Sequence, residues 1–163
     1  MAETVSADDL RDAWPLLDAE ERQAGFEGLE RADAPDFFQS LSSRAQAQIL
    51  LGCPPAERAL WARLLAPDDA VDALQEVPRE DWPIIIEALD APTRREVTAL
   101  LAYKEDEAGG LMSPRFVRAR SEMSVDEAIR YVRKQASERT VETIYYVYVL
   151  DAHQRLLGVV SFR

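Results

Sequence analysis

The sequence has few residues of the kinds that build catalytic and metal-binding centres. Among 163 residues it contains one cysteine, Cys53, and one histidine, His153. A lone cysteine excludes an internal disulfide and a cysteine-rich zinc site. A lone histidine leaves no histidine-based metal cluster or catalytic triad, and no glycine-rich phosphate loop is present. We therefore do not expect an enzyme.

Long apolar runs are also missing. The longest, residues 144–150, is far shorter than the roughly 18 apolar residues of a membrane-spanning helix. Residues 1–9 have neither the basic start nor the apolar core of a signal peptide. We expect this polypeptide to be soluble, and any membrane part of a parent protein to lie beyond Arg163.

Positive charge is scarce in the first two thirds of the chain. Residues 1–103 carry 21 Asp and Glu against 9 Arg, whereas residues 104–163 carry 9 acidic against 10 basic residues. An acidic domain repels phosphate backbones and anionic lipid but attracts cations. The charge distribution therefore argues against a nucleic-acid partner.

What the sequence does contain is an internal repeat. Apolar residues recur every twelve positions, and most residues three and four positions before them are apolar too, so that each unit has an apolar stripe on one helix face. We call these positions the ladder residues: Leu17, Leu29, Leu41, Cys53, Leu65, Val77, Leu89 and Leu101.

Helix-start signals follow the ladder residues. Asp18 and Glu21 have the spacing of a capping box, and prolines stand near expected first turns at Pro55, Pro67, Pro78 and Pro92. Each unit therefore predicts a short helix and a tight turn. Stacked units of this kind form an α-solenoid, so we expect seven or eight helices between residues 8 and 103, without strands.

The pattern changes after Tyr103. Charged residues followed by two glycines at 104–110 are typical of a linker. A strand is expected near 116–119, and a capping box at Ser124 and Glu127 precedes a helix. Two further strands, 143–150 and 156–162, are rich in β-branched and apolar residues. The expected fold is α+β, with a solenoid domain at 1–103 and a β-α-β-β unit at 104–163 in which all strands follow residue 114.

Two parts of the chain resemble a known family. The sequence YKEDEAGGLM at 103–112 closely resembles the segment that leads from the N domain into the paired CBS domains of MgtE-type magnesium transporters. The ladder resembles that family's N domain, and 143–149 and 157–161 resemble the start of its first CBS domain. The resemblance implies a right-handed superhelix of short helices followed by a truncated CBS domain. In the family, a further helix, a second CBS domain and a membrane pore follow.

Asp68 and Asp72 are the first candidate site residues. They are four residues apart and therefore share a helix face, and oxygen ligands suit Mg²⁺. The alternative explanation is that these residues stand near a helix start. Asp is favoured there because it caps the helix and interacts well with the helix dipole. The resemblance implies that Asp68 and Asp72 are ligands of regulatory magnesium ions.

Asp36 and Gly110 are further candidates that rest on the same resemblance. Asp36 stands at a position that is acidic in the family, although a solvated surface Asp explains it as well. The family uses a backbone carbonyl near the glycine pair as a ligand, which points to Gly110. A hinge with unusual backbone angles explains the glycines equally well.

The resemblance implies a Mg²⁺-sensing regulatory region on the cytoplasmic side of the cell membrane, in a multi-pass transporter. Magnesium would bridge acidic N-domain and CBS surfaces and close the pore. The expected partners are Mg²⁺, bound weakly by this chain, the second CBS and membrane domains, and a second copy that pairs through the CBS region.

Two alternatives remain open from the sequence. One is a helical-repeat scaffold for protein interactions. The other is an adenine-nucleotide sensor, although the acidic residue of the CBS nucleotide motif would fall at position 164, so that these 163 residues do not contain a complete nucleotide site.

Overall fold

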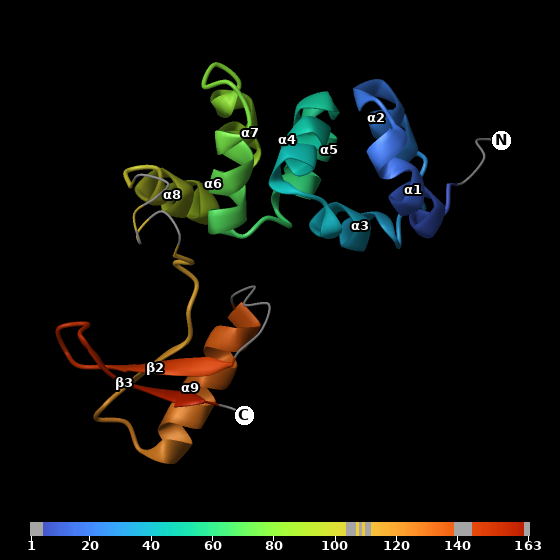
Figure 1. Cartoon of the computed structure of the whole chain (residues 1–163). Coiled ribbons are helices and arrows are strands. Elements are labelled where there is room, and N and C mark those ends of the chain that lie inside the picture. The colour runs from blue at the N-terminus through green and yellow to red at the C-terminus, as the bar shows by residue number, and fades with distance from the viewer. Residues whose placement is uncertain (1–4, 104–106, 108, 110–111, 139–144, 162–163) are drawn as a thin grey trace. The chain divides into compact units, whose positions relative to one another are not determined.

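The computed structural model describes residues 5–103, 107, 109, 112–138 and 145–161. The chain forms two compact units, Met1–Met112 and Ser113–Arg163 (Figure 1). Helices build the described part of the first unit, and a small sheet with a helix builds that of the second. The predicted α+β class is therefore confirmed. Among the described residues, no helix combines the length and hydrophobicity needed to cross a bilayer.

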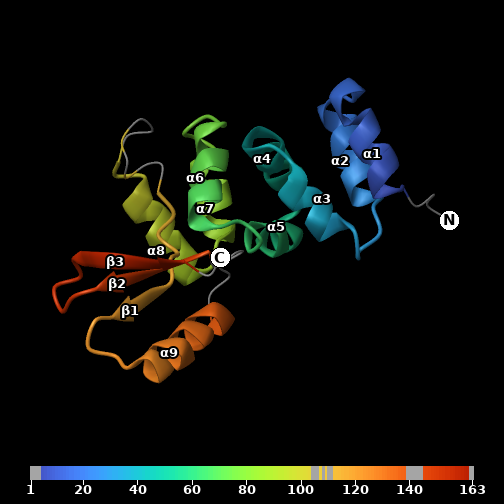
Figure 2. The ribbon, with the colours of Figure 1, turned by 60° about the horizontal axis from the view of Figure 1, so that its bottom comes forward.

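The first unit is a succession of short helices that follow one another in chain order (Figure 2). The prediction that residues up to 103 contain no strand holds for the described residues 5–103, in which Val5 and Leu29 form only an isolated bridge. The elements are α1 (Ala7–Ala13), the 3₁₀ helix η1 (Trp14–Leu16), α2 (Ala19–Glu27), α3 (Ala34–Ser40), α4 (Ser43–Gly52), α5 (Pro55–Ala62), α6 (Pro67–Gln75), α7 (Trp82–Ala88) and α8 (Ala91–Leu100).

The ladder residues lie at the ends of helices. Leu41, Cys53 and Leu89 directly follow α3, α4 and α7 and have extended backbones, with ψ angles of 154°, 145° and 147°. An extended residue ends a helix because it breaks the αR geometry. Cys53 and Leu89 are both 2% exposed, so these residues turn the chain and also fill the core. The twelve-residue period is the length of one helix with its turn.

Most of the predicted helix starts are confirmed. Asp18 and Glu21 form a reciprocal capping box on α2, and α5, α6 and α8 each have a proline in their first two positions. The prediction for Pro78 is wrong. Its carbonyl accepts a hydrogen bond from the N–H of Asp81 at 2.9 Å, so it opens a turn. α7 begins only at Trp82, and Pro83 takes the early helical position.

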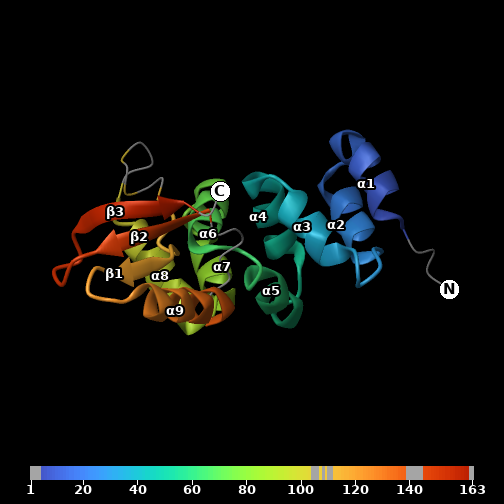
Figure 3. The same ribbon diagram turned by 90° about the horizontal axis from the view of Figure 1, so that it is seen from below.

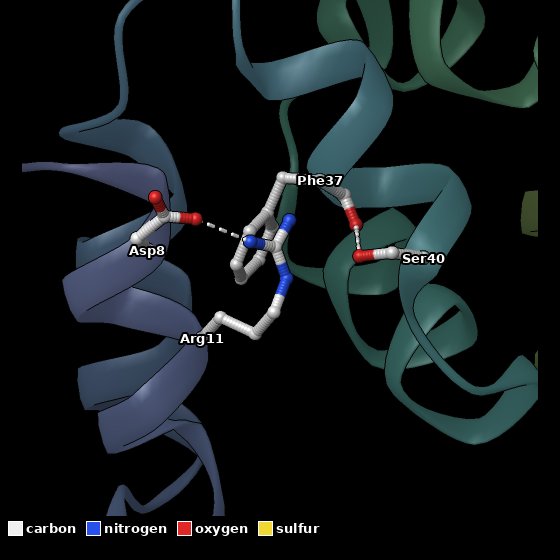
Figure 4. A network of polar contacts seen from close by, with 4 residues as sticks. All are labelled: Asp8, Arg11, Phe37 and Ser40. Atoms are coloured by element: carbon white, nitrogen blue, oxygen red, sulfur yellow. Dashed lines mark hydrogen bonds and ion pairs between the residues drawn. The ribbon is translucent and has the colours of Figure 1, made fainter.

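Aromatic rings join the first helices. Phe26 on α2 meets Trp61 on α5 edge to face at 4.9 Å between centroids, and Phe37 and Phe38 on α3 are at most 1% exposed. Figure 4 shows how α1 is attached to α3: the Arg11 guanidinium lies 5.6 Å from the centroid of the Phe37 ring and pairs with Asp8 at 2.8 Å. Cation–π contacts of this kind add to the burial of the ring.

Cys53, one of the ladder residues, is a core thiol. The amide of Gln23 donates to its sulfur at 3.7 Å, and burial raises the pKa of the thiol. A raised pKa keeps the sulfur protonated at neutral pH, so that it behaves as a small apolar side chain.

The second unit has the predicted order of strand, helix, strand, strand. It contains β1 (Arg118–Arg120), α9 (Val125–Glu138), β2 (Tyr146–Leu150) and β3 (Leu156–Ser161). The sheet order is β1-β2-β3, with β1 and β2 parallel and β2 and β3 antiparallel (Figure 3). β1 begins two residues later than expected; Phe116, which lies before it, packs edge to face on Tyr148 at 5.6 Å between ring centroids.

The core of the second unit is small. Val117, Ala119, Val132 and Val147 form its buried cluster. Gln135 on α9 accepts from the N–H of Arg118 at 3.4 Å and donates to its carbonyl at 2.7 Å, which holds α9 against β1. Much of β3 remains open to solvent: Leu156 and Leu157 are both 59% exposed, Val159 49% and Val160 51%.

Candidate functional site

The acidic face of α6 is the candidate site, and the opposite face of this helix positions it. Pro67, Ala70, Val71, Ala73 and Leu74 are all buried, with at most 2% exposure. These side chains pack α6 against α4 and α8, which lie on either side of it (Figure 2). Because the apolar stripe faces inward, residues one turn apart on the other side face outward.

Asp68 and Asp72 lie on this outward side. Asp68 is half-buried and Asp72 is exposed, and Asp68 and Asp69 both stand in the first turn. The positive end of the helix dipole favours carboxylates there, and the N-cap residue Ala66 supplies no side-chain hydrogen bond. The helix therefore favours carboxylates at its start and presents them on a well-packed element.

The chemistry of these donors suits a hard divalent cation. Mg²⁺ takes oxygen ligands in near-octahedral geometry and retains several waters. Two carboxylates one turn apart on the same helix can supply part of such a shell, directly or through water. They do not complete it, so that the remaining oxygens would come from water or from another surface.

Asp36 does not join this pair in one cluster in the described part of the chain. Asp36 is exposed in the first turn of α3, and the described residues contain no group of three acidic, histidine or cysteine side chains close enough to hold a metal ion. Gly110 lies outside the described residues. The assignment of Asp36, Asp68, Asp72 and Gly110 as ligands stays a prediction.

One hollow on the second unit was not found by sequence reasoning. It has a volume of about 470 Å³. Its lining consists of Met123, Tyr131 and the charged side chains of Arg120, Glu122, Glu127, Arg130 and Lys134. Hydrogen bonds from Ser124 lower the pKa of Glu127, so this carboxylate stays charged. Arg130 and Lys134 are four residues apart on α9 and could have indicated a charged helix face, but the hollow itself depends on α9 lying beside β1.

Comparison with known proteins identifies the first unit. Residues 5–106 match the family model of the MgtE intracellular N domain. The chain belongs to this family. The predicted resemblance to MgtE is thereby confirmed over residues 5–106.

MgtE relatives cover the rest of the chain as well. The magnesium transporter MgtE of Thermus thermophilus is 41% identical over 164 residues, which cover 99% of this chain and 36% of that protein. The chain thus spans little more than a third of the length of this relative.

Two solved structures have the same fold. The crystal structure of the cytosolic domain of the Mg²⁺ channel MgtE in complex with ATP matches with a TM-score of 0.78 and 41% identity, over 98% of this chain and 64% of the other. The crystal structure of the soluble part of a magnesium transporter matches with a TM-score of 0.63 and 26% identity, over 96% of this chain and 66% of the other. An MgtE N domain followed by part of a CBS domain accounts for both units.

Proposed function

We propose that this chain is the magnesium-sensing regulatory region of a magnesium transporter, located on the cytoplasmic side of the cell membrane. The observation that carries the proposal is the likeness, over 98% of the chain at 41% identity, to the cytosolic domain of the Mg²⁺ channel MgtE. We propose transport as the activity of the parent protein. For this chain we propose a regulatory role and no catalytic one.

In the proposed mechanism, magnesium acts on a two-state equilibrium. When magnesium is plentiful, ions bridge the acidic face of α6 and other acidic groups of the N domain to carboxylates of the CBS and membrane-side elements. Neutralising this repulsion stabilises a compact state that closes the pore. When magnesium falls, like charges separate the surfaces. An ion that binds one state better shifts the population toward it.

The same argument predicts weak binding by this chain alone. Asp68 and Asp72 can supply only part of an octahedral shell, and Mg²⁺ gives up its waters reluctantly. We therefore propose that the remaining ligands come from the rest of the transporter, and that this chain binds Mg²⁺ in the millimolar range or more weakly.

A magnesium titration followed by amide NMR tests the assignment. We expect the amide signals of α6 to shift with a millimolar midpoint, and the shift to disappear in Asp68→Asn/Asp72→Asn. The control Asp9→Asn/Asp12→Asn removes the same charge from exposed positions on α1 and should leave the α6 response intact. Micromolar binding that survives the Asp68→Asn/Asp72→Asn substitution would place the site elsewhere.

Adenine-nucleotide sensing by the second unit is a second candidate function. It is favoured because the solved MgtE cytosolic domain is a complex with ATP. Ser161, at the end of β3, stands where nucleotide-binding CBS domains have a hydroxyl residue, and the matching acidic position is 164. ATP titration should therefore give saturable binding with the parent protein and not with residues 1–163. Tight binding by residues 1–163 would show that these residues suffice.

A further inference from the structure

An arginine on α5 binds the end of the preceding helix. The Arg58 Nε donates to the carbonyl of Leu50 at 2.6 Å, and its Nη2 donates to the carbonyls of Leu51 at 3.3 Å and Cys53 at 2.7 Å. The last carbonyls of a helix have no partner within the helix. By satisfying three carbonyls at the end of α4, Arg58 fixes the angle between α4 and α5. We call this arrangement an arginine clamp.

The clamp recurs at the same spacing between α7 and α8. Arg94 on α8 donates to the carbonyls of Ile86, Glu87 and Leu89 at 3.0, 3.0 and 2.9 Å. As with Arg58, the acceptors lie eight, seven and five residues before the arginine. Arg94 therefore joins α7 to α8 as Arg58 joins α4 to α5.

A simpler form of the clamp stands in the first helices. The Nε of Arg22 donates to the carbonyl of Trp14, also eight residues earlier, at 3.0 Å, and its guanidinium lies 5.5 Å from the centroid of the Trp14 ring. Arg22, Arg58 and Arg94 are 36 residues apart. The twelve-residue ladder is thus grouped into modules of three units, each with one clamp.

The helix with the candidate site lies between two clamped pairs. α6 follows α5 directly in the chain and precedes α7, and it packs against α4 from one pair and α8 from the other. A change in the angle of either pair must therefore move α6, because α6 is joined to one member of each pair through the chain and to the other by packing.

We propose that Arg58 and Arg94 are positioning residues for the acidic face of α6. This inference rests on the proposed function, since it takes Asp68 and Asp72 to be ligands. Ligand groups must be held to within about 0.5 Å of their working geometry to be effective. Neither arginine is proposed as a ligand of the ion. Each acts by keeping α6 at the angle at which its carboxylates meet the opposing surface.

Substitution by lysine tests the clamps without altering net charge. Lysine has its three donors on a single nitrogen, so it cannot reproduce the bonds that Nε and Nη2 of a planar guanidinium make from two separate positions. In Arg58→Lys and Arg94→Lys we expect the amide signals of Ala70 and Val71 on α6 to shift even without magnesium. We expect the midpoint of the α6 magnesium titration to rise about threefold.

Arg22→Lys is the matched control. It removes the corresponding, simpler contact between α2 and Trp14, whereas α6 packs mainly against α4 and α8, so it should lower the urea midpoint of the first unit and leave the α6 signals and the magnesium midpoint unchanged. If Arg22→Lys raises the magnesium midpoint as much as Arg58→Lys does, the effect is general loss of stability and the positioning role is wrong.

Two further outcomes separate this inference from the proposed function. Unchanged α6 signals and an unchanged magnesium midpoint in both Arg58→Lys and Arg94→Lys would overturn the inference. If the α6 signals move in these variants while Asp68→Asn/Asp72→Asn leaves magnesium binding as it is, the clamps do position α6 and it is the magnesium assignment that fails.

Discussion

The two units differ in how completely their apolar surfaces are covered. Among the described residues of the first, 20 buried apolar residues form one cluster that extends from Leu10 on α1 to Leu100 on α8. In the second, the buried cluster has four residues, and Val159 and Val160 on β3 are about half exposed. Stacked short helices cover one another, whereas a sheet needs cover on its faces, and the described residues of the second unit supply one helix.

The units also differ in charge. Residues 1–112 carry 24 Asp and Glu against 10 Lys and Arg, and residues 113–163 carry 6 against 9. The first unit therefore attracts cations. The second unit has few acidic residues that could face those of the first across a bound cation. The proposed magnesium site on α6 would therefore need further carboxylates from other parts of the proposed transporter.

Truncating a core side chain in each unit should give the largest effects and show whether the units are independent. Phe38 is fully buried, and Phe38→Ala should lower the free energy of unfolding of the first unit by about 3–5 kcal/mol. Val147→Ala removes two methyl groups from the small cluster of the second unit and should cost about 2 kcal/mol there.

Tryptophan fluorescence can follow the first unit alone, because all three tryptophans, Trp14, Trp61 and Trp82, lie in it. Amide signals of β2 report the second. Urea titration should show each variant shifting only the transition of its own unit. A fluorescence transition that moves as far in Val147→Ala as in Phe38→Ala would contradict the division into two independent cores.

The uncovered apolar surface of β3 predicts self-association through the second unit. Placing a charge there should weaken it, because a charge buried without a partner is costly. We expect Val159→Lys to lower the association constant, measured by sedimentation, about tenfold or more. Ala99→Lys adds the same charge to an exposed position on α8 and should have little effect. If a chain ending at residue 112 associates as strongly as the whole chain, the surface on β3 is not the interface.

The smallest expected effect concerns the start of α9. Ser124 donates from its N–H at 2.9 Å and its hydroxyl at 2.8 Å to Glu127, and these bonds lower the pKa of that carboxyl. A carboxylate whose pKa is lower in the folded state stabilises the fold above its unfolded pKa, and this stabilisation is lost as the pH falls through the folded pKa. The amide signals of α9 should therefore show loosening below about pH 4.

Glu127→Gln removes the titrating group and should remove this pH dependence of α9. Asp126→Asn removes a neighbouring carboxylate that is not part of the capping box and should preserve it. An equal pH response in the wild type and in Glu127→Gln would assign the loosening to another group.

The sequence predicted those features of the fold that depend on neighbours in the chain. Residues three and four apart share a helix face wherever the helix lies, so the ladder predicted short helices before their packing was known. Caps act within one turn, so Asp18 and Ser124 marked helix starts correctly. Pro78 was misjudged because a proline near an expected first turn equally suits a turn, and Pro83 was the one inside the helix.

Motifs in the sequence indicated the MgtE family, and the acidic residues of the chain indicated an affinity for cations. Both follow from the identity and order of the residues, without knowledge of how the helices pack. Only the tertiary structure decided which helices flank α6, that three arginines 36 residues apart bind helix ends, and that Asp36 does not join Asp68 and Asp72 in one described cluster. These features depend on how separate helices pack, and packing is set by the shapes of many side chains that meet at once. The order of residues in the chain therefore shows which apolar stripe of each helix must be buried. It does not show which neighbouring helix buries that stripe.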